Sequence, residues 1–293
     1  MGRVLDSWNF AQGDAITDDL TAMRLLGGGE AYEAYLAFDD LTYAPVVVKV
    51  VRPGQVTDGS TLRGLRREVD TLSSVNHPAV VRGLRAVLDG ERPHVVLEQL
   101  DGPRLSTLVR RYGPLPEQQY LPLAIEIASA LHYLRRQRLV HLDVKPSNII
   151  MGAPARLIDL SVARTLEDAE RLGHPIGTDA YMAPEQCDPP ATGTPGFASD
   201  VWGLGATLFE AIAGYRPFDA GAADDDDAAA RFPQLRELSY TLPAQIPADV
   251  AKIVYACLEP EPADRPLPHE VADGLGPALE RAPRGRLAGF KVR

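Results

Sequence analysis

The stretch His141-Leu142-Asp143-Val144-Lys145-Pro146-Ser147-Asn148, followed by Ile158-Asp159-Leu160-Ser161, decides the fold of this chain. It gathers two carboxylates, one amide and one ammonium group into fewer than twenty residues. Mg²⁺ binds oxygen ligands such as carboxylates and amides, and an ammonium group balances the charge of a phosphate. The pattern therefore predicts a site that holds a magnesium-bound nucleotide phosphate against an acceptor hydroxyl.

These residues resemble the catalytic loop H-R-D-x-x-x-x-N and the metal-binding loop D-F-G of the eukaryotic-like Ser/Thr protein kinases. The resemblance implies an α+β, bilobal fold: an N-terminal lobe of antiparallel β-sheet with one main helix, and a mainly helical C-terminal lobe. It also implies transfer of the γ-phosphate of ATP, with Mg²⁺ or Mn²⁺, to Ser/Thr hydroxyls of proteins, the chain itself included. The nucleotide is expected in the crevice between the lobes.

The resemblance gives each residue of the motif a role. Asp143 would orient the acceptor hydroxyl and accept its proton, and Lys145 would neutralise charge on the γ-phosphate. Asn148 and Asp159 would hold Mg²⁺ through oxygen ligands. Thr178, in the segment that leads to Ala-Pro-Glu, would contact both Asp143 and Lys145.

Lys49 stands alone in an apolar, β-rich stretch over 42–51. A lysine buried there without a partner would be costly, so it either reaches water from an edge strand or serves a site. The resemblance favours the phosphate-contacting lysine of the family. Glu68, on a predicted helix over 60–74, would pair with it, although Glu68 also fits a solvated helix face.

Further nucleotide contacts are expected from a glycine cluster that precedes the Lys49 strand. The family has a third glycine where this chain has Tyr32, which adds bulk and restricts φ, so we expect reduced nucleotide affinity. The remaining nucleotide-binding candidates are Gly27, Gly28, Gly29, Glu98 and Leu100.

Two other positions differ from the family pattern. Ser161 replaces the glycine of D-F-G, and Leu142 replaces the arginine of H-R-D. Because that arginine commonly binds a phosphorylated residue of the activation loop, our hypothesis is that a phosphate on Thr165 or Thr178 does not switch this chain on through that contact.

The resemblance also implies two structural contacts. Glu185 of the Ala-Pro-Glu segment would form a buried ion pair with Arg265. Asp200 resembles the family residue that anchors the catalytic loop; the alternative is an ordinary carboxylate in the first turn of a helix.

The change from strands to helices places the domain boundary at Glu98–Gly102. We predict an N-terminal lobe over 1–100, a C-terminal lobe over 101–280 and a basic tail over 281–293. Amphipathic helices are expected over 120–136, 199–214 and 249–258, with Ser199 as an N-cap and Gly214 as a C-terminal stop. The acidic run Asp224–Asp227 is interpreted as a solvated loop or as a docking site for a basic partner.

Composition narrows the class of protein. The chain has 293 residues, 45% of them hydrophobic, and a formal net charge of -10. Nucleic acid is therefore disfavoured as the main partner, because phosphate backbones bind clustered Lys and Arg. Cys187 and Cys257 lack metal-ligand spacing, so two buried thiols in a reducing compartment are expected. No apolar run reaches about 18 residues, so no membrane span is expected.

Two other functions remain open. A pseudokinase, a regulatory module that keeps the fold and the nucleotide, is favoured by Tyr32 and Ser161. A small-molecule kinase of the aminoglycoside phosphotransferase type shares the Asp, the Asn and the second Asp. Such enzymes lack the lysine that stands here at Lys145 and the Ala-Pro-Glu segment, both of which this chain has. The motifs and the Ala-, Arg-, Gly- and Pro-rich composition look bacterial. A cytoplasmic kinase, the cytoplasmic domain of a longer membrane protein, and a homodimer all fit.

Overall fold

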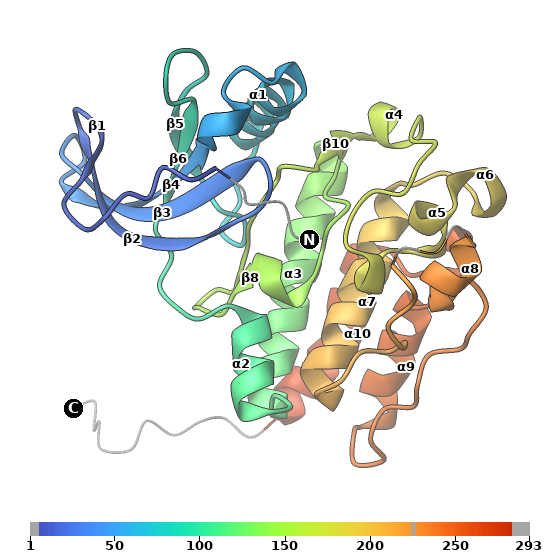
Figure 1. Ribbon diagram of the computed structural model, residues 1–293. Helices are drawn as coiled ribbons and strands as arrows, with labels where there is room; N and C mark the ends of the chain where they lie inside the picture. Colours follow the sequence, from blue (N-terminus) through green and yellow to red (C-terminus); the bar gives the residue numbers. More distant parts are fainter. Residues whose placement is uncertain (1–5, 224, 226, 283–293) are drawn as a thin grey trace, which may run out of the picture. The chain divides into compact units, whose positions relative to one another are not determined.

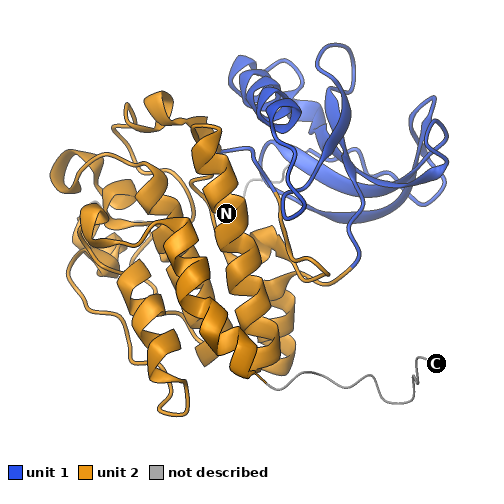
Figure 2. Cartoon of the chain, turned by 180° about the vertical axis from the view of Figure 1, so that it is seen from behind, with its two compact units in different colours: residues 1–101, 159–162 blue, residues 102–158, 163–293 orange. Residues whose placement is uncertain are grey.

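The computed structural model describes residues 6–223, 225 and 227–282 of the chain. The predicted basic tail over 281–293 lies almost wholly outside these residues. The chain forms two compact units, one of residues 1–101 with 159–162 and the other of residues 102–158 with 163–293 (Figure 2). The segment Asp159–Val162 groups with the first unit, whereas the division made from the sequence assigned it to the second part. One physical reason is the ion pair, 3.0 Å long, between Asp159 and Lys49.

Unit 1 contains an antiparallel sheet of six strands in the order β1-β2-β3-β4-β6-β5, with the helix α1 beside β5 and β6 (Figure 1). The predicted antiparallel sheet with one main helix is confirmed. The elements are β1 Ala15–Thr17, β2 Leu20–Gly28, β3 Tyr32–Asp39, β4 Ala44–Val51, α1 Gly59–Ser74, β5 Gly83–Val87 and β6 His94–Glu98.

Lys49 lies in the interior of this sheet, since β4 pairs with β3 on one side and with β6 on the other. An edge strand is therefore ruled out as the explanation for a lysine in this stretch. In the register of the sheet, Lys49 is opposite Ala34 of β3 and Val95 of β6. Its neighbours Val48 and Val50 are fully buried in the hydrophobic core.

The helix α1 begins where Asp58 accepts a hydrogen bond from the backbone N–H of Thr61 at 2.7 Å, as expected of an N-cap. One face of the helix is buried and carries Thr61, Leu65, Glu68 and Leu72. Glu68 therefore lies on the packed face, and the interpretation as a solvated face is wrong.

Unit 2 is mainly helical, as predicted. Its centre is α7, which is buried on nearly all sides and contacts both α3 and α9, while α10 lies against α3 and α9 (Figure 1). The long helices are α2 Leu105–Tyr112, α3 Glu117–Arg136, α7 Phe197–Ala213, α9 Ala248–Cys257 and α10 Pro268–Arg281. The short elements are β7 Leu139–Val140, β8 Ile149–Ile150, β9 Arg156–Leu157, β10 Arg164–Thr165, α4 Leu166–Ala169, α5 Pro184–Cys187, α6 Pro189–Thr192 and α8 Ala228–Arg231.

Both cysteines are free and buried, as predicted. Over the residues that the structure describes, no helix combines the length and the apolar character needed to cross a membrane.

The start of α7 differs from the prediction. Its N-cap is Gly196, and Ser199 lies within the first turn, so the prediction of Ser199 as the N-cap is wrong. The Ser199 hydroxyl accepts a hydrogen bond from the N–H of Gly196 and donates one to Glu185 at 2.7 Å. Ser199 is therefore the third residue of the helix, three positions after the cap. Gly214 ends the helix with φ of 83°, as predicted.

Glu185 and Arg265 form the expected ion pair, with distances of 2.6 and 2.9 Å between the guanidinium nitrogens and the carboxylate oxygens. Both side chains are at most 1% exposed. Arg265 also donates to the carbonyl oxygens of Ala198, Glu259 and Pro260. The buried charge is thus paired and its hydrogen bonds are satisfied, which is the condition under which a buried ion pair is tolerated.

We expect Glu185→Gln to lower the free energy of unfolding by about 3–5 kcal/mol, because Arg265 would remain buried without a carboxylate. Urea denaturation followed by far-UV circular dichroism measures this loss. Glu167→Gln is the matched control, since Glu167 pairs with Arg138 on the surface, where both side chains are about half exposed. An unfolding midpoint that shifts equally in the two variants would contradict the structural importance of the buried pair.

Candidate active site

Unit 1 holds the first group of predicted site residues around the ammonium of Lys49. Its Nζ lies 2.9 and 2.8 Å from the two carboxylate oxygens of Glu68 and 3.0 Å from Oδ1 of Asp159. The expected contact between Lys49 and Glu68 is therefore present. Burial acts to lower the pKa of Lys49, but the Glu68 and Asp159 carboxylates outweigh it and raise that pKa above its usual range. Lys49 is thus held as a cation at neutral pH.

Unit 2 holds the second group around the carboxylate of Asp143. Oδ1 of Asp143 accepts a hydrogen bond from the Thr178 hydroxyl at 2.7 Å, and Oδ2 accepts one from the Asn148 amide at 3.0 Å. The ammonium of Lys145 lies 2.6 Å from Oδ2 of Asp143 and donates to the Thr178 hydroxyl at 2.5 Å. The four side chains form one hydrogen-bonded network, with the predicted contacts of Thr178 to both Asp143 and Lys145.

Asp200, near the start of α7, holds the backbone of the catalytic loop. Its carboxylate accepts the backbone N–H groups of His141 and Leu142, each at 2.7 Å. The expected anchor is therefore present, and the interpretation as an ordinary helix-terminal carboxylate is wrong. Burial raises the pKa of Asp200 to about 6, although His141 and the two N–H groups favour its ionised form.

Leu142 takes the left-handed backbone conformation, with φ of 64°, while its side chain is buried. Such a conformation costs a non-glycine residue about 1–2 kcal/mol, and strained residues of this kind cluster at functional sites. The bonds of its N–H to Asp200 and of its carbonyl oxygen to Gln186, 2.8 Å long, hold the backbone in this state.

The segment after the catalytic loop doubles back as the hairpin β8–β9, in which Ile149 is opposite Leu157. As a result the N–H of Ile158 donates to the carbonyl oxygen of Asn148 at 2.8 Å. Asp159 is the next residue in the chain, and it too has a left-handed backbone, with φ of 65°. The hairpin therefore brings Ile158, ten residues after Asn148, back into contact with the backbone of Asn148. The predicted metal ligand Asp159 follows Ile158 in the sequence.

Asn148 and Asp159 suit Mg²⁺ by the chemistry of their donor atoms. The Nδ2 group of Asn148 donates to the carbonyl oxygen and to Oδ2 of Asp143, each at 3.0 Å, and this orientation leaves the amide oxygen as the atom for a cation. Asp159 contributes carboxylate oxygens, and its side chain is 37% exposed. Hard oxygen donors of these two kinds are the ligands that Mg²⁺ prefers.

The predicted nucleotide contacts of the glycine loop lie at the end of β2 and in the turn that follows. Gly27 and Gly28 end β2, and the N–H of Gly29 donates to the carbonyl oxygen of Tyr32 at 3.0 Å. A Cβ at Gly28 would lie 2.5 Å from the carbonyl oxygen of Tyr32. Only glycine fits at Gly28 without a shift of the backbone.

Glu98 and Leu100 lie at and just after the end of β6. The carboxylate of Glu98 accepts the N–H of Arg82 at 2.9 Å and pairs with its guanidinium at 3.2 Å, and the carbonyl oxygen of Leu100 accepts a hydrogen bond from Gln99. The Glu98 carboxylate is therefore engaged by Arg82 inside unit 1.

Gln186 is a structural residue of the site that the sequence analysis missed. Its amide donates to the carbonyl oxygens of Leu142 and Ile176, at 2.8 and 2.9 Å. It therefore ties the catalytic loop to the segment that carries Thr178. Nothing in the sequence marks it apart from its place after Glu185.

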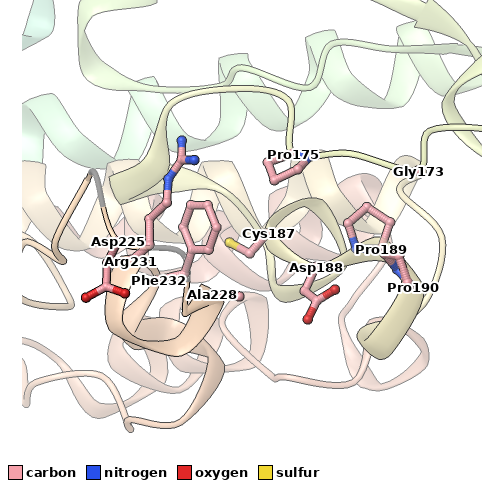
Figure 3. Close-up of a pocket in the computed structure, with 10 residues that line it drawn as sticks. All are labelled: Gly173, Pro175, Cys187, Asp188, Pro189, Pro190, Asp225, Ala228, Arg231 and Phe232. Atoms are coloured by element: carbon pink, nitrogen blue, oxygen red, sulfur yellow. The ribbon is translucent and has the colours of Figure 1, made fainter.

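A pocket of about 310 Å³ lies elsewhere in unit 2 and contains none of the predicted site residues (Figure 3). Arg231 lines it and forms two hydrogen bonds with Asp179, at 2.9 and 3.1 Å. Asp225, from the acidic run, also lines this pocket. The lining residues are Gly173, Pro175, Cys187, Asp188, Pro189, Pro190, Asp225, Ala228, Arg231 and Phe232.

Comparison with known proteins matches residues 20–274 to the protein kinase domain. The chain is 32% identical over 203 residues to the serine/threonine-protein kinase PknB of Mycobacterium leprae, which covers 66% of this chain and 32% of that protein. It is 30% identical to PkaA of Streptomyces coelicolor, with 78% and 42% covered, and 29% identical to PrkC of Bacillus subtilis, with 72% and 33% covered.

The chain thus spans about a third to two fifths of the length of these curated relatives. Because the match to the protein kinase domain covers most of the chain, and the relatives are bacterial Ser/Thr kinases, this chain belongs to the protein kinase family.

Proposed function

We propose that the chain transfers the γ-phosphate of ATP, with Mg²⁺ as cofactor, to Ser and Thr hydroxyls of protein substrates and of the chain itself. The observation that carries the proposal is the network of Asp143, Lys145, Asn148 and Thr178. Phosphoryl transfer depends mainly on positioning and on charge compensation, and this network supplies both. A cytoplasmic location, where ATP is available, is part of the proposal, and homodimerisation stays a prediction.

Asp143 would hold the acceptor hydroxyl and accept its proton. Its carboxylate is fixed by one hydrogen bond on each oxygen, from Thr178 and from Asn148, so it cannot rotate freely. Lys145 lies against the same carboxylate and would balance the negative charge of the transferred phosphoryl group. Thr178 would hold the side chains of Asp143 and Lys145 in place relative to each other, since its hydroxyl contacts both.

Lys49, held as a cation by Glu68 and Asp159, would contact the phosphates of ATP. Mg²⁺, when bound, would bridge phosphate oxygens and neutralise the charge that develops during transfer. Asn148 and Asp159 would supply its protein ligands. A small-molecule kinase fits less well, because Lys145 and Thr178 both take part in the network of unit 2.

Asp143→Asn should lower phosphate transfer by about 10²–10⁴-fold, because an amide cannot accept the proton of the acceptor hydroxyl. The measurement is incorporation of radiolabelled phosphate from ATP into the chain and into a generic Ser/Thr-rich protein, followed by mass spectrometry of the modified residues. Chelation of Mg²⁺ with EDTA should abolish incorporation by the unaltered chain.

Asp168→Asn is the control for this substitution, because Asp168 is an exposed carboxylate that pairs with the exposed Arg171. Equal incorporation by the Asp143→Asn chain and the unaltered chain would overturn the proposed activity and favour a pseudokinase.

Thr178→Val should lower kcat by about ten- to a hundredfold, since Val removes the hydroxyl that contacts both Asp143 and Lys145 and leaves their geometry unsupported. Thr178→Ser keeps the hydroxyl and should retain most of the rate. Steady-state kinetics with varied ATP separates the two cases. If Val and Ser variants lost activity to the same extent, the hydroxyl would not be the important group.

Thr165→Ala should leave activity within about twofold of the unaltered chain, because no arginine at position 142 awaits a phosphate there. The Thr165 hydroxyl instead accepts the N–H of Asp168 at 3.2 Å and caps α4, so its loss is expected to affect the local helix alone. The same phosphate-incorporation assay tests this, and loss of most activity would refute the hypothesis about switching.

A further inference from the structure

Tyr32, which replaces the third glycine of the nucleotide loop, has a side chain that is packed within unit 1. Its hydroxyl donates a hydrogen bond to the carbonyl oxygen of Thr61 at 2.9 Å. Its ring centroid lies 4.8 Å from Nζ of Lys49, and an aromatic face attracts a cation at this distance. One side chain therefore contacts both the helix α1 and the lysine that pairs with it.

The two attachments of α1 fall on the same face of the helix. Thr61 lies in the first turn, and Glu68 follows about two turns later on the same buried stripe. Lys49 holds the helix at Glu68, and Tyr32 holds it at Thr61. In addition to its packing beside β5 and β6, the helix is thus attached to side chains of β3 and β4 at two points about two turns apart.

The helix leaves room for this contact. Gly64 stands in the interior of α1, where glycine is unfavourable compared with alanine. A Cβ at Gly64 would lie 3.2 Å from the hydroxyl oxygen of Tyr32, which is tighter than ordinary contact. Burial raises the pKa of Tyr32 to about 12, so the hydroxyl stays protonated and can donate at neutral pH.

Tyr32 also belongs to the glycine loop through its backbone. Its carbonyl oxygen accepts the N–H of Gly29 at 3.0 Å, and the carbonyl oxygen of Gly29 accepts a hydrogen bond from Arg52 at 2.7 Å. The residue that closes the turn therefore also reaches α1. A displacement of the helix would pull on the loop.

We propose that Tyr32 is a positioning residue that latches α1 in the orientation in which Glu68 pairs with Lys49. The latch lies entirely within unit 1 and needs no phosphate. It suits a chain whose catalytic loop carries Leu142 where an arginine would bind an activating phosphate. The tyrosine that replaces glycine at this position thus adds side-chain contacts, besides restricting the backbone. The effect on turnover rests on the proposed kinase function, whereas the effect on α1 does not.

Steady-state kinetics tests the latch through turnover. Tyr32→Phe keeps the ring over Lys49 and removes one hydrogen bond, so kcat should fall about two- to tenfold while the KM for ATP changes less than about twofold. Tyr32→Gly, which restores the family residue, should lower kcat further. Tyr43→Phe is the matched control, because it removes a hydroxyl from the turn between β3 and β4 at a site that is 82% exposed. A raised kcat in Tyr32→Gly would overturn the proposal and show that Tyr32 obstructs the nucleotide.

Hydrogen–deuterium exchange of the full chain tests the latch without any need for catalysis. Amides of α1 should exchange about two- to tenfold faster in Tyr32→Phe than in the unaltered chain or in Tyr43→Phe, with β6 unchanged. Faster exchange in a chain that shows no phosphate transfer would support the latch and separate it from the proposed function. Unchanged exchange in α1 would overturn the latch whatever the activity.

Gly64→Ala supplies a second variant that keeps Tyr32. Alanine favours the helix by itself, yet its methyl group would crowd the Tyr32 hydroxyl. We therefore expect faster exchange of α1 in Gly64→Ala, and slower exchange when the same change is made in Tyr32→Gly. Such a reversal is the coupling expected of two residues in contact, and slower exchange in both backgrounds would overturn the proposal.

Discussion

The carboxylate of Asp200 is the contact on which the arrangement of unit 2 depends. It reaches from a buried helix to two successive backbone N–H groups, those of His141 and Leu142. Leu142, which carries the second of these groups, has a left-handed backbone with φ of 64°. Asp143 follows directly, so Asp200 holds the backbone just before it, while Thr178 and Asn148 hold its carboxylate. A buried carboxylate is costly, and the two charge-assisted hydrogen bonds offset part of that cost.

The two groups of site residues compensate their buried charges in different ways. In unit 1 an ammonium is buried and is compensated by two carboxylates, Glu68 and Asp159. In unit 2 the partly buried carboxylate of Asp143 is compensated by one ammonium and two neutral donors. Each cluster is satisfied within its own unit. A phosphate that arrives near Lys49 therefore has to compete with carboxylates already in place, and a cation at Asp159 would relieve that competition.

The sequence predicted best those features that depend on the chemistry of a single side chain. The resemblance to the family implied the pairs of Lys49 with Glu68 and of Glu185 with Arg265, and the cost of burying a lone lysine supported the first of them. It predicted less well those that depend on backbone conformation. Gly196 as the cap of α7 and the amide bonds of Gln186 involve backbone atoms, which every residue has, so no side chain announces them. The grouping of Asp159–Val162 with unit 1 is of the same kind, since it follows from a contact between residues far apart in the sequence.

The same distinction explains which departures from the family motifs this fold tolerates. Position 142 acts through its N–H and its carbonyl oxygen, so a buried leucine can replace an arginine without loss of the loop. Ser161 likewise directs its N–H toward Oδ1 of Asp159 at 3.4 Å, a bond that glycine would make equally well. Asp143, Asn148 and Lys49 act through side-chain atoms, and no other residue type supplies the same groups at the same reach. Tyr32 is the opposite case, because a position where the family needs only a small residue acquires a side chain with contacts of its own. A substitution there changes what holds α1, while the substitutions at 142 and 161 leave the local backbone bonds in place.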